Sequence, residues 1–329
     1  MRRLLALVML AACTRTKDVV PVLALDASPS GALPVAWDAG FDPADTDAGA
    51  DAGPLFDDEA YRTRDPAGGK SIGHTSVVFK LKLEGGLVAA FKPRSRRGNT
   101  RYRGEVAAYR VARALDLDNV PRVLVRSFDA DALRRALTAS GAAPIFDQEV
   151  LISGSRVTGA LIPWLPKLDF LPLEAEPWLS RWRGWLRNDA AIPSDQRALA
   201  AQISTMVVFD YLTGNWDRWS GGNVGLDGEH GALLYIDNDG AFYDVPPPAA
   251  MERQLGILRG VDRFSRHFVA ALRALDREHL ARAVGEESPG VPLLTPRALD
   301  GVDARRKRAL ETIDAKIVDG GGPATLAFE

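Results

Sequence analysis

Alternating hydrophobic and polar residues mark the start of the globular part of the sequence and predict β-strands. Two such runs, 75–83 and 87–93, flank Glu84–Gly85–Gly86, a pattern typical of a β-hairpin closed by a glycine turn. Further strands are expected at 120–126, 149–152 and 157–162, the last two as a second hairpin. An amphipathic helix is expected over 105–115. Together these runs predict a small antiparallel sheet with one inserted helix.

The second half of the sequence has helical rather than strand spacing. Pro163–Trp164–Leu165–Pro166 breaks the strand pattern and predicts a hinge. Beyond it, Trp178, Trp182 and Trp185 recur on one helical face, and such a stripe usually packs into a core. Further helices are expected at 198–211, 264–275 and 305–317. The expected fold is therefore α+β, with an N-terminal lobe at 66–163, a mostly helical C-terminal lobe at 164–320 and a tail at 321–329.

The N-terminus carries a short apolar run after two arginines. Residues 4–12 are too few to span a bilayer, which takes about 20 apolar residues. The run ends in Leu10–Ala11–Ala12–Cys13, which resembles the cleavage site of a bacterial lipoprotein. We therefore expect residues 1–12 to be a lipoprotein signal peptide and Cys13 to carry a lipid. An ordinary secretory signal that contains a cysteine is the alternative.

Composition changes after Cys13. Residues 26–56 consist mainly of Asp, Ala, Gly and Pro, and they show neither helical nor strand spacing. Such a segment buries too little apolar surface to offset the entropy of ordering, so residues 13–65 are expected to form a flexible, lipid-anchored tether. The Asp–Ala–Gly repeats at 45–53 match the spacing of no known calcium loop.

Charge and metal-ligand content exclude several functions. The formal net charge is −2, which argues against nucleic acid as a partner. Cys13 is the single cysteine, so the domain is expected to be held by its core without disulfides. The histidines show no metal-ligand spacing, which argues against a zinc site; they are His74, His230, His267 and His279.

A lysine and a glutamate in the first half suggest nucleotide chemistry. Lys92 ends an apolar strand and Glu105 opens the following helix. Kinases use such a pair to hold the lysine against nucleotide phosphates, although a lysine at a strand edge is also a common surface feature. The glycine-bearing loop that contains Lys70 and Gly73 is a weak phosphate-loop signal. The basic stretch 94–103 is interpreted mainly as a solvated loop, with Arg101 and Arg103 close enough to the Glu105 helix to face a cleft.

The strongest signal lies in the second half. A loop carries Asp217 and then Asn223, and the next apolar strand ends at Asp237. Phosphoryl transfer requires these groups: one carboxylate accepts the proton of the attacking hydroxyl, while an amide and a second carboxylate hold divalent ions. A β-hairpin with Asn, Asp and Gly in its turns would explain the residue types but not their order beside Lys92 and Glu105.

The segments 209–218 and 235–240 resemble the catalytic and metal-binding segments of the four-jointed and Golgi casein kinase family. Phosphatidylinositol kinases and HipA-type kinases share a looser version. The segments 91–93, 104–109 and 120–121 follow the same order as in that family, so the similarity covers most of residues 70–280. It implies a two-lobed atypical protein-kinase-like fold that uses ATP with Mn²⁺ or Mg²⁺.

The resemblance also implies roles for individual residues. Lys92 would contact the phosphates and take part in catalysis. The glycine-bearing loop, not the resemblance, is what suggests that Lys70 and Gly73 help to bind the nucleotide. Glu105 would fix Lys92 or bind a metal ion. The resemblance implies Asp217 as the catalytic base and Asp237 as a metal ligand.

The sequence departs from the family at several points. The disulfide cysteines of the eukaryotic secreted members are absent. Asn223 lies one residue further from Asp217 than in related kinases, which leaves Asn215 as the alternative amide ligand. Trp219 replaces the histidine of the looser relatives, which suggests a different acceptor surface.

The expected function is that of an ATP-dependent phosphotransferase, similar to a Ser/Thr protein kinase, acting on a hydroxyl of an exported protein or glycan. The alternative is a catalytically inactive nucleotide-binding scaffold, because ATP is scarce outside the inner membrane. We expect a monomer held at the bacterial cell envelope through Cys13.

Overall fold

The computed structural model describes residues 58–73, 76–98, 100–165 and 168–329. The predicted signal peptide, Cys13 and most of the predicted tether lie outside these residues. The tether was expected to reach residue 65, but its described end is ordered: helix α1 covers Asp58–Thr63 and buries Tyr61. The folded domain therefore begins earlier than the composition predicts.

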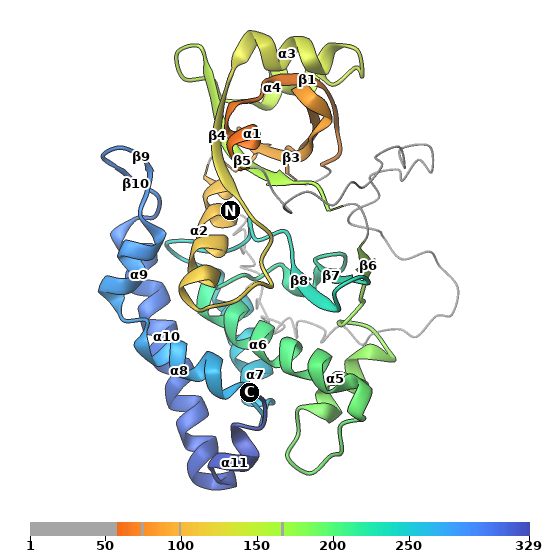
Figure 1. Cartoon of the computed structure of the whole chain (residues 1–329). Coiled ribbons are helices and arrows are strands. Elements are labelled where there is room, and N and C mark those ends of the chain that lie inside the picture. Colours follow the sequence, from red (N-terminus) through yellow and green to blue (C-terminus); the bar gives the residue numbers. More distant parts are fainter. Residues whose placement is uncertain (1–57, 74–75, 99, 166–167) are drawn as a thin grey trace, which may run out of the picture. The chain divides into compact units, whose positions relative to one another are not determined.

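The N-terminal sheet is antiparallel and has the strand order β1-β2-β3-β5-β4 (Figure 1). Its strands are β1 (Pro66–Ser71), β2 (Phe79–Leu83), β3 (Val88–Pro93), β4 (Leu124–Asp129) and β5 (Arg156–Pro163). The predicted hairpin is confirmed as β2 and β3, which pair from Phe79 opposite Phe91 to Lys82 opposite Val88. Alternate residues of β2 are buried, as expected for a strand with one face on a core.

Two helices pack against this sheet, α3 (Ala130–Thr138) and α4 (Ala143–Glu149). Leu133, Leu137 and Phe146 are buried with Phe79 and Phe91 in one hydrophobic cluster. The prediction of a strand at 149–152 was wrong, because Glu149 ends α4 and only Val150 forms an isolated bridge, to Ser95. Ala143 and Phe146 are buried at helical spacing, and Val150 is the extended residue that caps the helix.

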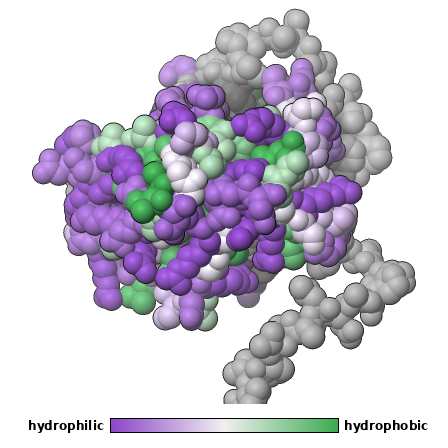
Figure 2. Space-filling model, turned by 90° about the horizontal axis from the view of Figure 1, so that it is seen from below, coloured by the Kyte–Doolittle hydropathy of each residue, from purple (hydrophilic) through white to green (hydrophobic). Residues whose placement is uncertain are grey.

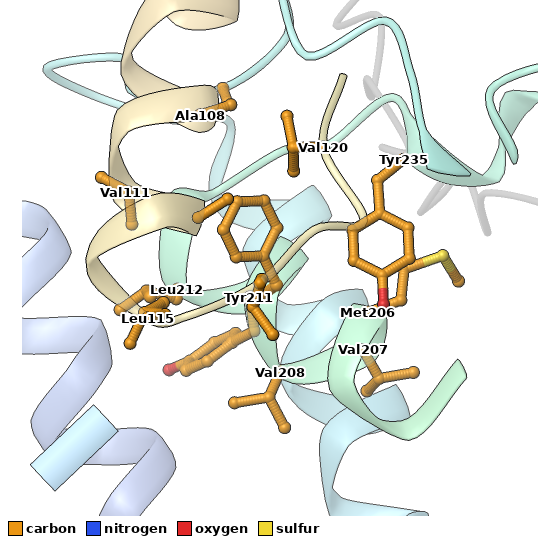
Figure 3. Close-up of a cluster of buried hydrophobic side chains, with 14 of the residues drawn as sticks. Ala108, Val111, Leu115, Val120, Met206, Val207, Val208, Tyr211, Leu212 and Tyr235 are labelled. Atoms are coloured by element: carbon orange, nitrogen blue, oxygen red, sulfur yellow. The ribbon is translucent and has the colours of Figure 1, made fainter. Parts of the chain in front are cut away.

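Helix α2 (Arg101–Ala114) follows β3 but belongs to a second, larger hydrophobic cluster. Figure 3 shows Ala108, Val111 and Leu115 from the α2 region beside Val208 and Leu212. The second cluster extends through most of the C-terminal helices. By its packing, α2 is thus part of the helical half of the protein.

The C-terminal half is mostly helical, as predicted. Its helices are α5 (Trp178–Trp185), α6 (Arg197–Thr213), α7 (Pro248–Arg259), α8 (Arg266–Ala274), α9 (Arg277–Val284), α10 (Pro296–Gly320) and α11 (Gly322–Thr325). Its strands are β6 (Asp169–Phe170), β7 (Val224–Asp227), β8 (Ala232–Tyr235), β9 (Glu286–Ser288) and β10 (Val291–Pro292). Helix α6 is buried on almost every side from Ile203 to Thr213, which explains its uniformly apolar sequence.

The tryptophan stripe and the chain end both join this core. Trp182 and Trp185 are buried, and Trp182 stacks on Trp219 with ring centroids 5.4 Å apart. The segment predicted as a tail, 321–329, instead contains α11, and its Phe328 is buried against the core and pairs with Ser265. The reason is that Phe328 removes a large aromatic side chain from water.

The described surface is largely polar. Figure 2 shows one face on which hydrophilic residues predominate and hydrophobic residues form small separate groups. Within the described ranges, no helix combines the length and hydrophobicity needed to cross a membrane.

Candidate active site

Lys92 lies at the centre of a cluster of carboxylates contributed by distant segments. Its Nζ atom is 2.5 Å from Glu105 Oε1, 2.6 Å from Asp237 Oδ1 and 3.4 Å from Asp239 Oδ2. The lysine is on β3, Glu105 is on α2, and the two aspartates follow β8. The predicted pair of Lys92 and Glu105 is therefore formed, and it faces the aspartate expected to bind metal.

The backbone of α2 lies close to the backbone of the segment that carries Asp237 and Asp239. Gly104 precedes Glu105, and a Cβ atom on Gly104 would lie 2.7 Å from the carbonyl oxygen of Asn238. A side chain at this position would push the helix away from the segment that follows β8. The small residue therefore sets the distance between Glu105 and Asp237.

The backbone after β8 has an unusual conformation. Asp237 has a φ of +55°, in the left-handed region that L-residues other than Asn, Asp and Gly rarely adopt. Asp237 and Asp239, on either side of Asn238, both contact Lys92.

Electrostatic interactions within the cluster favour the ionised forms of Lys92 and Asp237. Burial alone would lower the pKa of Lys92, but Asp237, Asp239 and Glu105 together raise it well above its usual value. Burial alone would raise the pKa of Asp237, but Lys92 lowers it below the usual range. Burial raises the pKa of Glu105 despite Lys92. At neutral pH, Lys92 is a cation held beside an ionised Asp237.

The carboxylates also form a potential metal site. One oxygen from each of Glu105, Asp237 and Asp239 lies within 4.8 Å of the other two. Carboxylate oxygens are the ligands that Mg²⁺ and Mn²⁺ prefer, so the donor set fits such an ion. The sequence predicted Glu105 and Asp237 but missed Asp239, whose only signal was its position two residues after Asp237.

Asp217 lies in the loop between α6 and β7. Its backbone N–H donates to Asn215 Oδ1 (3.2 Å), and its carbonyl accepts from Asn223 Nδ2 (2.8 Å). A Cβ atom on Gly240 would lie 3.1 Å from Asp217 Cβ, so the Asp217 loop touches the segment that carries Asp237 and Asp239. The predicted base and the predicted metal ligands are thus on adjoining loops.

Arg218 fixes the two loops to each other. Its side chain is completely buried, and its Nε lies 3.1 Å from both carboxylate oxygens of Asp210 on α6. The same guanidinium donates to the carbonyl of Asn223 (2.6 Å), to Asn238 Oδ1 (2.6 Å) and to the carbonyl of Ile236. No role for Arg218 is predicted from the sequence. The only available signal was its place beside Asp217.

The two candidate amides have different surroundings. Asn215 is buried, and its Oδ1 accepts the backbone N–H of Asp217, so this side chain shapes the loop. Asn223 is also buried, beside the Asp217 carbonyl. Its role as a metal ligand stays a prediction.

The predicted nucleotide-binding residues Lys70 and Gly73 lie in the first strand pair. Lys70 is in β1, opposite Lys80 of β2. Gly73 follows β1, and its backbone N–H donates to the carbonyl of Val78 (3.3 Å). A Cβ atom on Gly73 would overlap the Ser76 carbonyl, so the tight turn requires glycine. Contact of either residue with a nucleotide stays a prediction.

The two arginines expected to face the cleft point in different directions. Arg101 Nη2 contacts Asp239 Oδ1, beside Lys92. Arg103 instead contacts Glu287 on β9, so its expected position in the cleft was wrong. Residues two positions apart lie on nearly opposite sides of a helix, which explains the difference.

Comparisons with known proteins agree with this geometry. No protein-family model matches the chain. The chain is 24% identical to a glycosaminoglycan xylosylkinase of Danio rerio, over 78% of this chain and 73% of that protein.

Solved structures show the same fold. A crystal structure of the Golgi casein kinase aligns with a TM-score of 0.62 at 15% identity, covering 82% of this chain and 77% of the other. The Golgi casein kinase with Mn/ADP bound gives a TM-score of 0.59 at 14% identity, covering 80% and 76%. The hydra Fam20 structure with sugar gives 0.60 at 16% identity, covering 80% and 88%.

The expected two-lobed, kinase-like α+β fold is therefore confirmed. The residues that carried the resemblance in the sequence also meet in one site, with Lys92 between Glu105 and Asp237. In its fold, in this arrangement and in its similarity to the xylosylkinase, the chain resembles the kinases of the four-jointed and Golgi casein kinase family.

Proposed function

We propose that this protein is an ATP-dependent kinase that phosphorylates a hydroxyl group on an exported protein or glycan. The observation that carries the proposal is the position of Lys92, buried among Glu105, Asp237 and Asp239 and adjoining the Asp217 loop. A buried lysine and three carboxylates converge there from separate segments. They match the groups that bind a nucleotide and its metal ions.

Each residue has a distinct task in this proposal. Lys92 neutralises phosphate charge, and Glu105 keeps its ammonium group in place. Asp237 and Asp239, with Glu105, offer oxygen ligands to Mn²⁺ or Mg²⁺, an ion that when bound offsets the charge of the phosphates. Asp217 orients the acceptor hydroxyl and accepts its proton. The proteins that this chain resembles include a glycosaminoglycan xylosylkinase and the Golgi casein kinase, so both acceptor classes are retained.

Labelled ATP provides the direct test. The purified protein is incubated with ATP and either Mn²⁺ or Mg²⁺, and both ATP hydrolysis and label transfer to casein or xylosides are measured. We expect activity that Asp217→Ala and Asp237→Ala abolish and that the exposed Asp195→Ala leaves intact. Metal-dependent ATP binding without turnover would instead support an inactive scaffold. If ATP neither binds nor turns over, the proposed kinase activity is refuted.

We further propose that the protein is held at the bacterial cell envelope by a lipid on Cys13. The support is the sequence Leu10–Ala11–Ala12–Cys13, which lies outside the described residues. In a bacterial host, labelled fatty acid should enter the wild-type protein but not a Cys13→Ser variant. Equal labelling of both proteins would contradict the anchor.

A further inference from the structure

Arg101 opens helix α2 on the same side as the carboxylate cluster. Its Nη2 contacts Asp239 Oδ1, while the other oxygen of Asp239 lies 3.4 Å from Lys92 Nζ. One carboxylate therefore joins two cations. Gly98, with a φ of +116°, lets the Arg101 side chain fold back over the preceding turn, because a Cβ atom there would overlap Arg101 Cδ.

The guanidinium keeps hydrogen-bonding capacity. An arginine has five N–H donors, and the Nε of Arg101 is buried without a hydrogen-bond partner among the described residues. The Nε of Arg103 is in the same state, so the difference between the two arginines is the partner of each guanidinium: Asp239 of the cluster for Arg101 and Glu287 for Arg103. The Arg101 side chain is still 20% exposed, which leaves a ligand access to it.

Arg101 contacts a segment that also adjoins the Asp217 loop. Its partner Asp239 is followed by Gly240, where a Cβ atom would lie 3.1 Å from Asp217 Cβ. The charges of Arg101, Asp239 and Asp217 also act on Tyr243, whose pKa is raised mainly by burial.

Resting on the proposed function, we propose that Arg101 binds the phosphoryl group that is transferred, as a catalytic residue on the opposite flank from Lys92. In the transfer, the acceptor oxygen bonds to the γ-phosphorus as the bond to the bridging oxygen breaks. That electron pair leaves with ADP, and the hydroxyl proton passes to Asp217. The γ-phosphoryl oxygens carry negative charge throughout, and the planar fork of Arg101 offers two parallel donors to them.

The charge of the cluster supports this assignment. Glu105, Asp237 and Asp239 carry three carboxylates, and Lys92 and Arg101 are the cations in contact with them. A divalent ion on the aspartates would take over part of the charge that Arg101 now balances. Arg101 would then be free to turn its donors toward phosphate.

Nucleotide binding by an Arg101 series tests the assignment. Affinities for ADP and for a non-hydrolysable ATP analogue are measured by calorimetry with Mn²⁺, for wild type, Arg101→Gln, Arg101→Lys and Arg103→Gln. The Arg103 variant is the matched control, because Arg103 is on the same helix turn but binds Glu287. Label transfer at saturating ATP is measured in parallel.

We expect Arg101→Gln to weaken binding of the ATP analogue about tenfold to a hundredfold, the range for loss of a charge-assisted hydrogen bond. The affinity for ADP should be nearly unchanged. Arg101→Lys should keep part of the preference for the triphosphate, and Arg103→Gln should keep all of it. The rate at saturating ATP should fall with Arg101→Gln.

Other outcomes overturn the assignment in distinguishable ways. An equal loss of ADP and analogue binding in Arg101→Gln would mean that Arg101 only supports Asp239. An unchanged preference would mean that it contacts no phosphate. In both cases wild-type turnover would leave the proposed kinase intact, whereas wild-type protein that binds neither nucleotide would refute both proposals.

Discussion

Arg218 combines complete burial with a network of polar contacts. Replacing it with methionine would leave Asp210 buried without its cation and would release the carbonyls of Asn223 and Ile236. Breaking a buried ion pair by removing one partner typically costs about 3 to 5 kcal/mol. We expect Arg218→Met to lower the free energy of unfolding in urea by about that amount.

Arg277 provides the matched control for this substitution. It forms an exposed pair with Asp300, with 39% of the arginine side chain accessible, and exposed pairs contribute about 0 to 1 kcal/mol. Arg277→Met should therefore change stability little. Similar losses for both variants would show that the Arg218 network does not support the fold, and recovery in an Arg218→Met/Asp210→Leu double variant would confirm that the lone carboxylate carries the cost.

Asp303, which lies outside the candidate active site, should make the folding stability depend on pH. It accepts from Arg306 Nε (2.9 Å) and pairs with Lys307 Nζ (2.7 Å); burial alone would raise its pKa, but these partners lower it. A lowered folded pKa means that the stabilisation is present above the unfolded value of about 3.9 and is lost as the pH falls through the folded pKa.

The difference in unfolding free energy between wild type and Asp303→Asn should thus be largest near neutral pH and should shrink below about pH 4. Urea unfolding at several pH values measures it. A difference that grows on acidification would mean that the pKa is raised instead.

At the scale of elements, the contact between α2 and the segment after β8 determines the site. A Cβ on Gly104 would meet the Asn238 carbonyl at 2.7 Å, and backbone cannot give way as a side chain can. Gly104→Ala should lower stability by about 1 to 3 kcal/mol through overpacking, and it should separate Glu105 from Asp237. Weakened Mn²⁺ binding by calorimetry would report that separation.

Gly256 on α7 is the control for this effect. A Cβ there has no heavy atom within 4 Å, and alanine is a better helix former than glycine by about 1 kcal/mol. Gly256→Ala should therefore raise the thermal unfolding midpoint while Gly104→Ala lowers it. Equal shifts in one direction would contradict the packing argument.

The local spacing of apolar residues predicted most helices and strands. It failed where contacts between distant segments determine the structure. The hairpin of β2 and β3 could be read from alternation, and α6 from its long apolar run. The short apolar segment 149–152 resembled a strand, but Glu149 is the last residue of a helix and Val150 is its cap. Phe328 could not be predicted to be buried, because one aromatic residue near a chain end has no period.

At the scale of the whole molecule, the carboxylate cluster joins segments far apart in the sequence. Lys92→Met should leave Glu105, Asp237 and Asp239 in mutual repulsion and lower the thermal unfolding midpoint. Mn²⁺ should then stabilise the variant more than the wild type, because it would neutralise the same carboxylates. Thermal unfolding across a Mn²⁺ titration measures this difference.

Lys80→Met is a suitable control, because Lys80 of β2 contacts the ring of Trp164 and not the carboxylate cluster. Its response to Mn²⁺ should equal that of the wild type. A Lys92→Met variant without an enhanced Mn²⁺ response would show that the carboxylates do not act together as a metal site.

The candidate site could be predicted from residue order, but not all of its contacts. The order of Lys92, Glu105, Asp217 and Asp237 indicated the chemistry, and the structure places Lys92, Glu105 and Asp237 in contact. Asp239 was missed because its contacts with Lys92 and Arg101 depend on the approach of distant segments, which residue types alone do not show. The roles of Arg101 and Arg218 depend on the approach of separate loops, which sequence spacing does not give.

The two hydrophobic clusters have a mechanical consequence. Glu105 is on α2, which packs into the larger cluster, whereas Phe91, next to Lys92, packs into the cluster of the sheet. A rocking motion of the sheet would carry Lys92 away while the three carboxylates stay together. We therefore expect the metal ion to bind to the three carboxylates first. Lys92 would then approach them as the sheet closes over the nucleotide.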